Sequence, residues 1–148
     1  MHQPLHDSGE LAIIVFVTVI TAQRKAILAN PAASRVLVDS WKAADAWLVG
    51  RYVILPDHIH LFCSPADPSV RLKAWVKYWK GLASRHWPRR QEQPIWQLDF
   101  WDTQLRRDES YMEKWLYVLH NPVRSGLVAV PEDWPYAGEL NALPWDSP

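Results

Sequence analysis

Residues 52–63, with the sequence YVILPDHIHLFC, contain two strand-like apolar runs that are separated by Pro56 and Asp57. Because proline and aspartate interrupt strands and favour turns, the stretch predicts either a β-hairpin or one bulged strand. The second run carries His58 and His60 with one isoleucine between them. Successive side chains of a strand point to opposite faces, so both imidazoles are expected on one face of a sheet.

The segments on either side of this stretch predict further strands and helices. Residues 11–21 are rich in β-branched side chains, which is typical of a central strand that is buried on both faces. Asn30 and Pro31 supply a helix cap and a first helical residue, and the apolar spacing predicts that this helix continues to Gly50. The remaining predicted elements are a helix over residues 69–86, a strand over 95–100 and a helix over 109–121.

The predicted order is β-α-β-β-α-β followed by a helix, which is the ferredoxin-like (RRM-like) arrangement with a C-terminal addition. We therefore expect an α+β fold with an antiparallel sheet. The 148 residues suit a single domain over positions 1–148. From about residue 129 onward, the chain is rich in proline and tryptophan and is expected to pack as an irregular tail.

The composition is that of an ordinary globular protein. Hydrophobic residues make up 49%, and 16 basic and 16 acidic residues give a formal net charge of zero. This balance argues against a disordered chain and against a generally basic nucleic-acid coat, so any affinity for an anion must be local. The apolar run of residues 11–20 is too short to span a membrane and lacks the basic start of a signal peptide. With Cys63 as the single cysteine, we expect a cytoplasmic protein.

The chain contains ten tryptophans, whose rings could stack on unpaired bases, but most of them are expected in the core. The helix over residues 69–86 shows why, because a step of about 100° per residue separates it into two faces. One face is apolar and is expected in the core: Leu72, Trp75, Trp79 and Leu82. The other face is basic and either lies in solvent or contacts a phosphate backbone: Lys73, Lys77 and Lys80.

In the helix predicted over residues 109–121, Tyr117 lies in the middle of the polar face, together with His120 and Asn121. A helical tyrosine usually packs its ring against the core, as is expected for Tyr111 on the apolar side. The exposed position of Tyr117 therefore suggests a chemical role.

The two histidines and this tyrosine are compatible with phosphoryl transfer. Two imidazoles on one strand face leave metal positions open for a further ligand and a substrate, which is typical of a catalytic site. A tyrosine hydroxyl, with an ordinary pKa near 10, is a poor nucleophile at neutral pH unless a cation or base assists it. A metal held by His58 and His60 could polarise a phosphodiester while Tyr117 attacks the phosphorus.

These residues resemble the REP-associated tyrosine transposases, which belong with the single-tyrosine HUH transposases of the smallest insertion sequences. Two runs carry the resemblance most specifically, Pro56-Asp-His-Ile-His60 and Tyr117-Val-Leu-His-Asn-Pro-Val-Arg124. Further matching stretches are residues 16–24, 52–55, 95–97, 105–109, 125–128 and 133–134. The matches follow the family's order across most of the chain.

The resemblance implies an endonuclease and strand transferase that acts on single-stranded DNA, often on hairpin-forming repeats. It assigns His58 and His60 to one Mg²⁺ or Mn²⁺ ion. It also assigns Tyr117 to a covalent 5′-phosphotyrosine link. The family's additional ligand, one helical turn after the tyrosine, would be Asn121, with His120 as the alternative.

Other predictions concern DNA contacts and competing functions. Family members often have histidine where this chain has Thr103, so that histidine's role is missing here. Two alternatives remain: a non-catalytic single-stranded nucleic-acid-binding module of the same fold, and a zinc-dependent hydrolase that uses His58 and His60. Cys63 is disfavoured as its third ligand, because strand positions 60 and 63 face opposite ways. A monomer and a homodimer, and a mobile element's enzyme and a host protein, are all compatible with the sequence. The expected contacts to the DNA backbone are Lys73, Lys77, Lys80, Arg106, Arg107 and Arg24.

Overall fold

The structure, a computed structural model, describes residues 13–106 and 109–144. Its strands are β1 (Val15–Thr21), β2 (Trp47–Ile54), β3 (His58–Pro65), β4 (Trp96–Gln104) and β5 (Ala137–Glu139). Its helices are α1 (Pro31–Ala43), α2 (Leu72–Arg85), α3 (Tyr111–Leu119) and α4 (Asn121–Arg124). Single 3₁₀ turns lie at Ala22–Arg24, Arg90–Glu92 and Pro131–Asp133.

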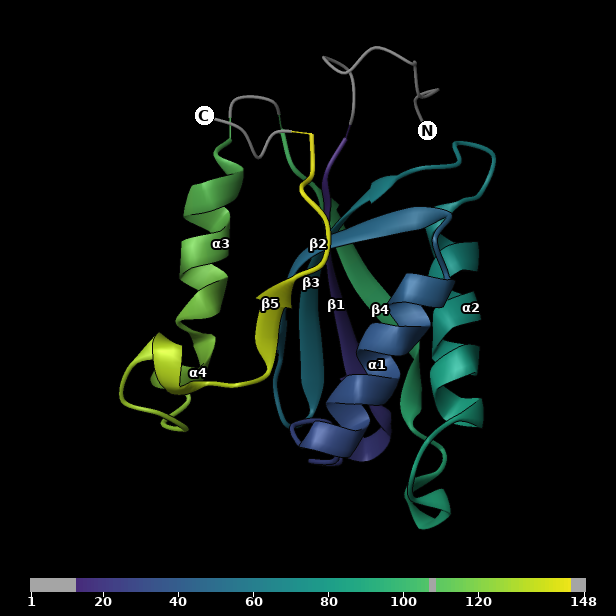
Figure 1. The fold of residues 1–148 in the computed structure, drawn as a ribbon, viewed down its shortest axis with the longest axis vertical. Helices are drawn as coiled ribbons and strands as arrows, with labels where there is room; N and C mark the ends of the chain where they lie inside the picture. The colour runs from purple at the N-terminus through teal and green to yellow at the C-terminus, as the bar shows by residue number, and fades with distance from the viewer. Residues whose placement is uncertain (1–12, 107–108, 145–148) are drawn as a thin grey trace.

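The strands form one five-stranded sheet in the order β4-β1-β3-β2-β5, and every neighbouring pair is antiparallel. Helices α1 and α2 cover one face of the sheet, and α3 lies on the other (Figure 1). The predicted α+β fold with an antiparallel sheet is therefore confirmed, and the elements from β1 to β4 follow the predicted β-α-β-β-α-β order. No helix in the described residues is both long and apolar enough to cross a membrane.

The stretch 52–63 forms a hairpin, which decides between the two predicted alternatives. The Leu55 N–H donates to the His58 carbonyl at 2.8 Å across the Pro56-Asp57 turn. The turn is also attached to the end of β1, because the Thr21 N–H donates to the Asp57 carbonyl at 3.0 Å. The start of β3 is thus fixed from two sides.

The face toward α1 and α2 holds the larger core. Trp75 and Trp79 are 1% and 0% exposed, which confirms the predicted apolar face of α2. In β1 the side chains alternate between buried and half-buried. The prediction that this strand is buried on both faces is therefore wrong, because α3 covers the opposite face only in part.

The first helix ends at Ala43, not at Gly50, and residues 47–54 form β2 instead. Its helical spacing of apolar residues continued by coincidence into a segment of aromatic and β-branched residues, which favour a strand. Gly50 has a packing role there, because a Cβ atom would lie 2.6 Å from both the Leu143 side chain and the Tyr111 hydroxyl. Glycine thus permits three segments to meet at β2.

The C-terminal segment is less irregular than expected. Strand β5 pairs with β2 and adds a fifth strand to the sheet. Upstream of it, the Trp134 Nε1–H donates to the Ile54 carbonyl at 3.0 Å. Gly138 allows close contact, since a Cβ atom there would lie 2.9 Å from the Tyr52 hydroxyl.

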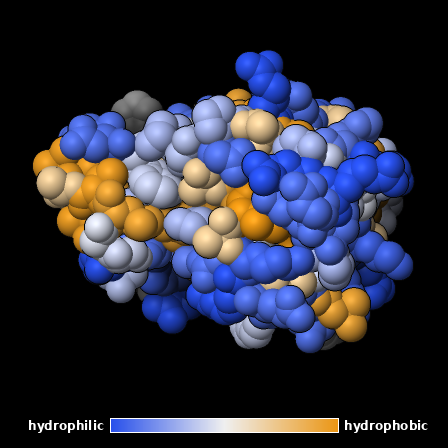
Figure 2. All heavy atoms as spheres, turned by 90° about the horizontal axis from the view of Figure 1, so that it is seen from below, coloured by the Kyte–Doolittle hydropathy of each residue, from blue (hydrophilic) through white to orange (hydrophobic). Residues whose placement is uncertain are grey.

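Helix α3 packs through Tyr111, Trp115 and Val118, which are buried with Phe62 of β3 in a second core cluster. It is shorter than predicted, because the chain turns after Leu119 into the separate helix α4, which begins at Asn121 and has Pro122 in its first turn. Hydrophobic side chains gather on the surface at the end of the molecule that carries α4 (Figure 2). Downstream of α4, Leu127 and Val130 are 43% and 45% exposed.

Candidate active site

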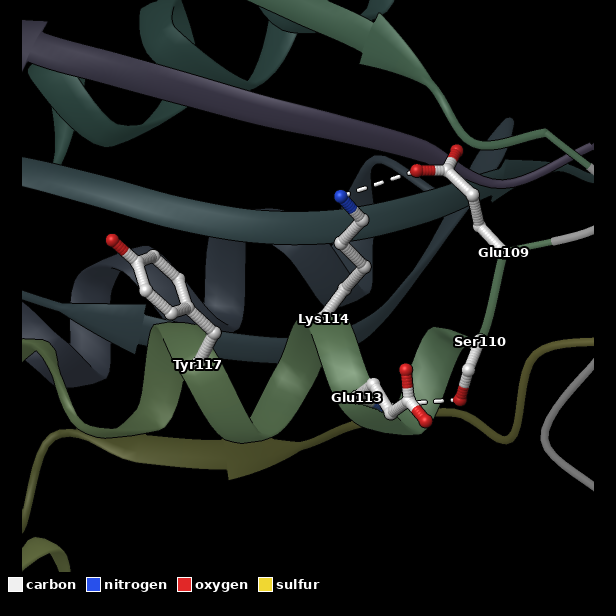
Figure 3. A pocket seen from close by; sticks show the side chains of 5 residues that line it. All are labelled: Glu109, Ser110, Glu113, Lys114 and Tyr117. Atoms are coloured by element: carbon white, nitrogen blue, oxygen red, sulfur yellow. Dashed lines mark hydrogen bonds and ion pairs between the residues drawn. The ribbon is translucent and has the colours of Figure 1, made fainter.

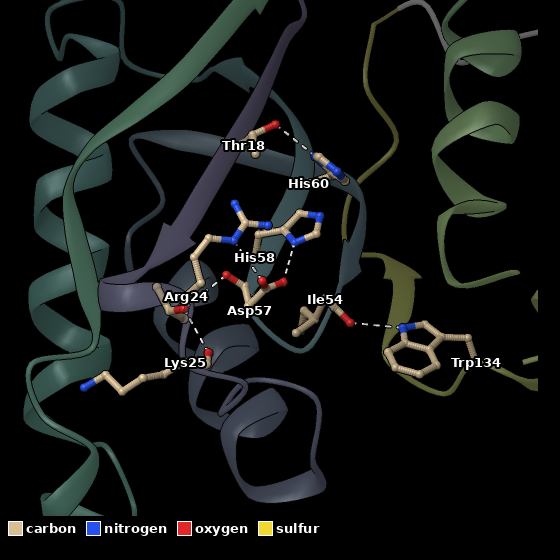
Figure 4. A network of polar contacts seen from close by, with 9 residues as sticks. Thr18, Arg24, Lys25, Ile54, Asp57, His58, His60 and Trp134 are labelled. Carbon is tan, nitrogen blue, oxygen red and sulfur yellow. Dashed lines mark hydrogen bonds and ion pairs between the residues drawn. The ribbon is translucent and has the colours of Figure 1, made fainter. Parts of the chain in front are cut away.

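His58 and His60 lie side by side on the sheet face opposite α1 and α2. Both are half-buried, whereas the intervening Ile59 is fully buried in the larger core. Their ring centroids are 4.8 Å apart in an edge-to-face arrangement. The predicted shared face is therefore observed, and Figure 4 shows both rings extending from β3 toward the same side.

Asp57 orients His58. Its carboxylate Oδ1 lies 2.8 Å from His58 Nδ1 and can only accept when ionised, so Nδ1 carries the proton and Nε2 keeps its lone pair. The Arg24 Nε–H donates to Asp57 Oδ2 at 3.0 Å. Burial alone would raise the pKa of Asp57, but the hydrogen bond with His58 and the charges of His58 and Arg24 outweigh it and lower the pKa.

Arg24 reaches this carboxylate from an unusual backbone conformation. Gln23 and Arg24 have φ values of 58° and 53°, a left-handed region that non-glycine residues rarely occupy. Such strain persists where surrounding contacts fix it and is enriched at functional sites. The strained turn after β1 therefore supports the orientation of His58.

His60 is held by β1. Its Nδ1 lies 2.9 Å from Thr18 Oγ1, and its ring stacks on Phe16 with centroids 5.3 Å apart. Burial, followed by the charges of His58 and Arg124, lowers the pKa of His60 from 6.5 to about 4. The imidazole is therefore neutral near pH 7. When Thr18 Oγ1 accepts a hydrogen bond from the Nδ1–H of His60, the Nε2 atom keeps a lone pair that it can donate to a metal.

Tyr117 is 68% exposed on α3, which agrees with its predicted place on the polar face. It lines an open hollow of about 550 Å³ at the side of this helix, together with Glu109, Ser110, Glu113 and Lys114. Figure 3 shows Tyr117 and Lys114 extending from the same side of α3. The Lys114 ammonium pairs with Glu109 at 3.1 Å, so Glu113 is the carboxylate of this hollow without an ion pair in the described residues.

Arg124 connects the tyrosine with the histidines. Its guanidinium carbon lies 4.0 Å from the centroid of the Tyr117 ring, and its positive charge contributes to the lowered pKa of His60. Sequence reasoning missed this residue, although it ends the run that starts at Tyr117. Because Arg124 forms no ion pair in the described residues, its N–H groups remain able to donate to an anion.

The two candidates for an additional ligand differ in their partners. The Nδ1–H of His120 donates to the Leu116 carbonyl at 2.9 Å, at the end of α3. Asn121 is half-buried at the start of α4, and its side chain has no hydrogen bond in the described part of the chain. The amide of Asn121 is therefore the less engaged of the two groups.

The donor set around His58 and His60 is small. The described residues contain no group of three or more histidine, cysteine, aspartate or glutamate side chains that could hold a metal ion. Cys63 is fully buried on the opposite face, where its thiol contacts the Val15 carbonyl at 3.7 Å and burial raises its pKa. The structure confirms that Cys63 does not share the face of His58 and His60, whereas the two imidazoles and the Asn121 amide are donor groups that suit a divalent ion with open positions.

The predicted backbone contacts lie in different surroundings. Lys73 and Lys77 are exposed along a groove of about 750 Å³ between α2 and β4. Lys80 lines the same groove, but it is half-buried, its ammonium donates to the Gln97 carbonyl at 2.8 Å, and burial lowers its pKa. Arg106 is exposed near the start of α3, and Arg107 lies outside the described residues. Their contacts with DNA, like that of Arg24, stay predictions.

Comparison with curated proteins finds two relatives. No family model matches the chain. A protein of Haemophilus influenzae that is assigned as a REP-associated tyrosine transposase is 33% identical over 95 residues, which cover 57% of this chain and 54% of the relative. A REP-associated tyrosine transposase of Escherichia coli is 25% identical over 89 residues, covering 60% and 52%. The chain thus spans about half the length of the curated relatives it matches.

Comparison with solved structures identifies the same kind of protein. A REP-associated tyrosine transposase bound to a REP hairpin matches with a TM-score of 0.70 and 21% identity over 93% of this chain and 81% of that chain. A Deinococcus radiodurans protein assigned as a transposase matches with a TM-score of 0.54 and 18% identity over 72% and 88%. At these identities the matches show a shared fold. The resemblance to the REP-associated tyrosine transposases is therefore confirmed, because both curated relatives carry that name and a solved structure of that name shares the fold.

Proposed function

We propose that the chain is a transposase-like enzyme that cleaves and rejoins single-stranded DNA through a 5′-phosphotyrosine intermediate. The contact of Arg124 carries this proposal. Its guanidinium lies over the Tyr117 ring, and its charge reaches His60. One cation thus contacts the exposed tyrosine of α3 and also acts on His60 of β3.

The proposed substrate is DNA with an unpaired strand, in or beside a hairpin-forming repeat. The REP-associated transposase with the matching fold is bound to a REP hairpin, which supports a hairpin partner here. Tyr117 is 68% exposed, so a flexible single strand can reach its hydroxyl.

In the proposed reaction the Tyr117 oxygen attacks the phosphorus of a DNA phosphodiester. A bond from the Tyr117 oxygen to phosphorus forms as the hydroxyl proton is lost to water. The bond from phosphorus to the 3′-oxygen breaks, and the leaving oxygen takes up a proton to become a 3′-hydroxyl. Attack by a 3′-hydroxyl of another strand reverses these bond changes and releases Tyr117. The Arg124 guanidinium, with its flat face on the tyrosine ring, would donate from its edge to the phosphate oxygens.

We also propose that the Nε2 atoms of His58 and His60 and the amide oxygen of Asn121 hold one Mg²⁺ or Mn²⁺ ion. Such an ion would polarise the phosphodiester and neutralise the negative charge that develops on it. Within the protein, Asp57 and Thr18 fix the two rings through Nδ1, which keeps both Nε2 atoms available.

A covalent adduct tests this function. Wild-type protein, single-stranded oligonucleotides from the flanks of its own gene and Mn²⁺ should give an SDS-resistant protein–DNA adduct. Tyr117→Phe should abolish the adduct and leave DNA binding nearly unchanged, because the ring and its contact with Arg124 remain. The matched control is Tyr78→Phe, since Tyr78 is 55% exposed on α2.

The same experiment separates the enzyme from a binding module. Binding of these oligonucleotides without an adduct, in either Mg²⁺ or Mn²⁺, would contradict the enzyme and favour a non-catalytic module of the same fold. An adduct that persists in Tyr117→Phe would assign the nucleophile to another residue.

A further inference from the structure

Trp101 of β4 has a place that distinguishes it from the other described tryptophans. It is 55% exposed, whereas the others within residues 13–106 and 109–144 are buried or half-buried. In this part of the chain, its indole makes no hydrogen bond and no ring contact. A large apolar ring that stays exposed on a folded protein indicates a binding surface, because burying such a ring in the core would have stabilised the fold.

The strand register places this indole on the same sheet face as the histidines. Thr18 of β1 is the register partner of both His60 on β3 and Trp101 on β4. Partners in an antiparallel pair point to one face, and the hydrogen bond between Thr18 and His60 identifies which face it is. The adjacent row supports this assignment, because Val17 and its partner Leu61 are fully buried on the opposite face.

Trp101, Thr18 and His60 therefore form one row across three strands. With strands spaced about 4.8 Å apart, the two ends of the row are separated by roughly 10 Å. Helix α3 packs on the cluster that contains Val53, Phe62 and Trp115, whereas residues 101–104 of β4 are all exposed.

We propose that Trp101 is a stacking platform for an unpaired DNA base next to the phosphate at Tyr117. The occupant is nucleic acid because the row ends at the histidine pair, and the exposed Arg124 cation, 4.0 Å from the Tyr117 ring centroid, has no ion pair in the described residues. Aromatic rings next to a cationic backbone site are the usual means of binding single strands. The position of this base relative to the attacked phosphate rests on the proposed function, whereas the stacking does not.

Affinity for a single strand tests the stacking without any reaction. In a Tyr117→Phe background, the full chain is titrated with oligothymidylate, in which every base can stack. Trp101→Ala should weaken binding by roughly 5- to 140-fold, whereas Trp101→Phe should retain most of the affinity. Tyr78→Ala is the control, because Tyr78 is equally exposed but lies on α2, which covers the other face. Equal affinity of Trp101→Ala and its parent, or equal losses in the Trp101 and Tyr78 variants, would overturn the proposal.

Abasic substitutions identify the stacked base in an oligonucleotide that forms the adduct. Removing one base near the cleaved bond should weaken binding to the parent protein, which retains Trp101. The same abasic substitution should not weaken binding to the Trp101→Ala variant any further. Full additivity at every position would overturn the proposal. If wild type forms no adduct but Trp101→Ala still loses affinity for oligothymidylate, the stacking site stands and the proposed function fails.

Discussion

The two faces of the sheet are built from the same strands but are covered differently. On the face toward α1 and α2, Val17, Leu61 and Trp79 are completely buried. On the opposite face, Thr18 and His60 are half-buried and bond to each other. Alternation along β1 and β3 thus assigns one set of side chains to the core and the next set to the partly exposed face that carries the candidate site.

The sheet face on which a residue lies therefore determines which measured property its substitution changes. A change under α2 should alter the free energy of unfolding, and a change on the histidine face should alter metal binding, DNA binding or adduct formation. The largest effect is expected in the core, where no solvent can replace a lost contact.

Trp79→Ala should lower the free energy of unfolding by about 3–5 kcal/mol, because it removes a fully buried ring and leaves a cavity. Trp101→Ala removes the same ring from the exposed end of the row and should change it by only about 0.5 kcal/mol. Urea denaturation measures both values. Similar losses in the two variants would mean that the faces do not differ in their contribution to stability.

Arg124→Gln should slow adduct formation by roughly 100- to 1,000-fold, since it removes a charged donor aimed at the developing phosphate charge. The rate of Arg124→Lys should lie between those of wild type and Arg124→Gln, because the lysine ammonium keeps the charge but not the planar fork of donors. The rate is measured by SDS gel at saturating DNA. The control is Arg85→Gln, an exposed arginine at the end of α2. Wild-type rates in Arg124→Gln would remove Arg124 from the proposed site.

Asp57→Asn should weaken Mn²⁺ binding by about 10- to 100-fold, because the amide no longer fixes His58 through a charged acceptor. Titration calorimetry without DNA measures this affinity. Asp67→Asn serves as the control, since its carboxylate contacts Ser69 on an exposed loop. Unchanged affinity in Asp57→Asn would show that the orientation of His58 does not determine metal binding.

Acid should destabilise the fold through His60. Its pKa is lowered to about 4 from 6.5, so the unfolded chain binds a proton at a higher pH than the folded chain. Stability should therefore fall as the pH decreases from about 6.5 toward 4, by on the order of 1 kcal/mol at pH 5 for this half-buried ring. His60→Gln should lose less stability than wild type between pH 7.5 and 5 in urea denaturation. Parallel pH profiles would assign the effect to other groups.

The sequence predicted features that depend on local pattern. The two-residue period of a strand predicts that His58 and His60 share a face of β3. The helical period predicts that Trp75 and Trp79 are buried and that Tyr117 is exposed. The turn at Pro56-Asp57 follows from turn chemistry. These properties need no knowledge of which segments meet in space.

Features that depend on distant segments could not be read in the same way. Thr18 and Trp101 share a row with His60 only through the strand register, and the contact between Arg124 and Tyr117 joins two separate helices, α4 and α3. Strand β5 is three residues long, too short for a recognisable alternation. The sequence alone made Gly50 look like the end of a helix, because the residues that require a glycine there, Tyr111 and Leu143, lie more than 50 positions away in the chain.

Gly50 also sets the spacing between the sheet and the helix that carries Tyr117. The Tyr111 hydroxyl, at the first turn of α3, contacts β2 at this point and accepts a hydrogen bond from the Arg51 N–H at 3.0 Å. A larger residue at position 50 would push the first turn of α3 away from β2. The helix would then tilt, and Tyr117 would move relative to the histidine pair. The alignment of the two halves of the proposed site therefore depends in part on a glycine in β2, a strand that supplies none of the proposed reacting groups.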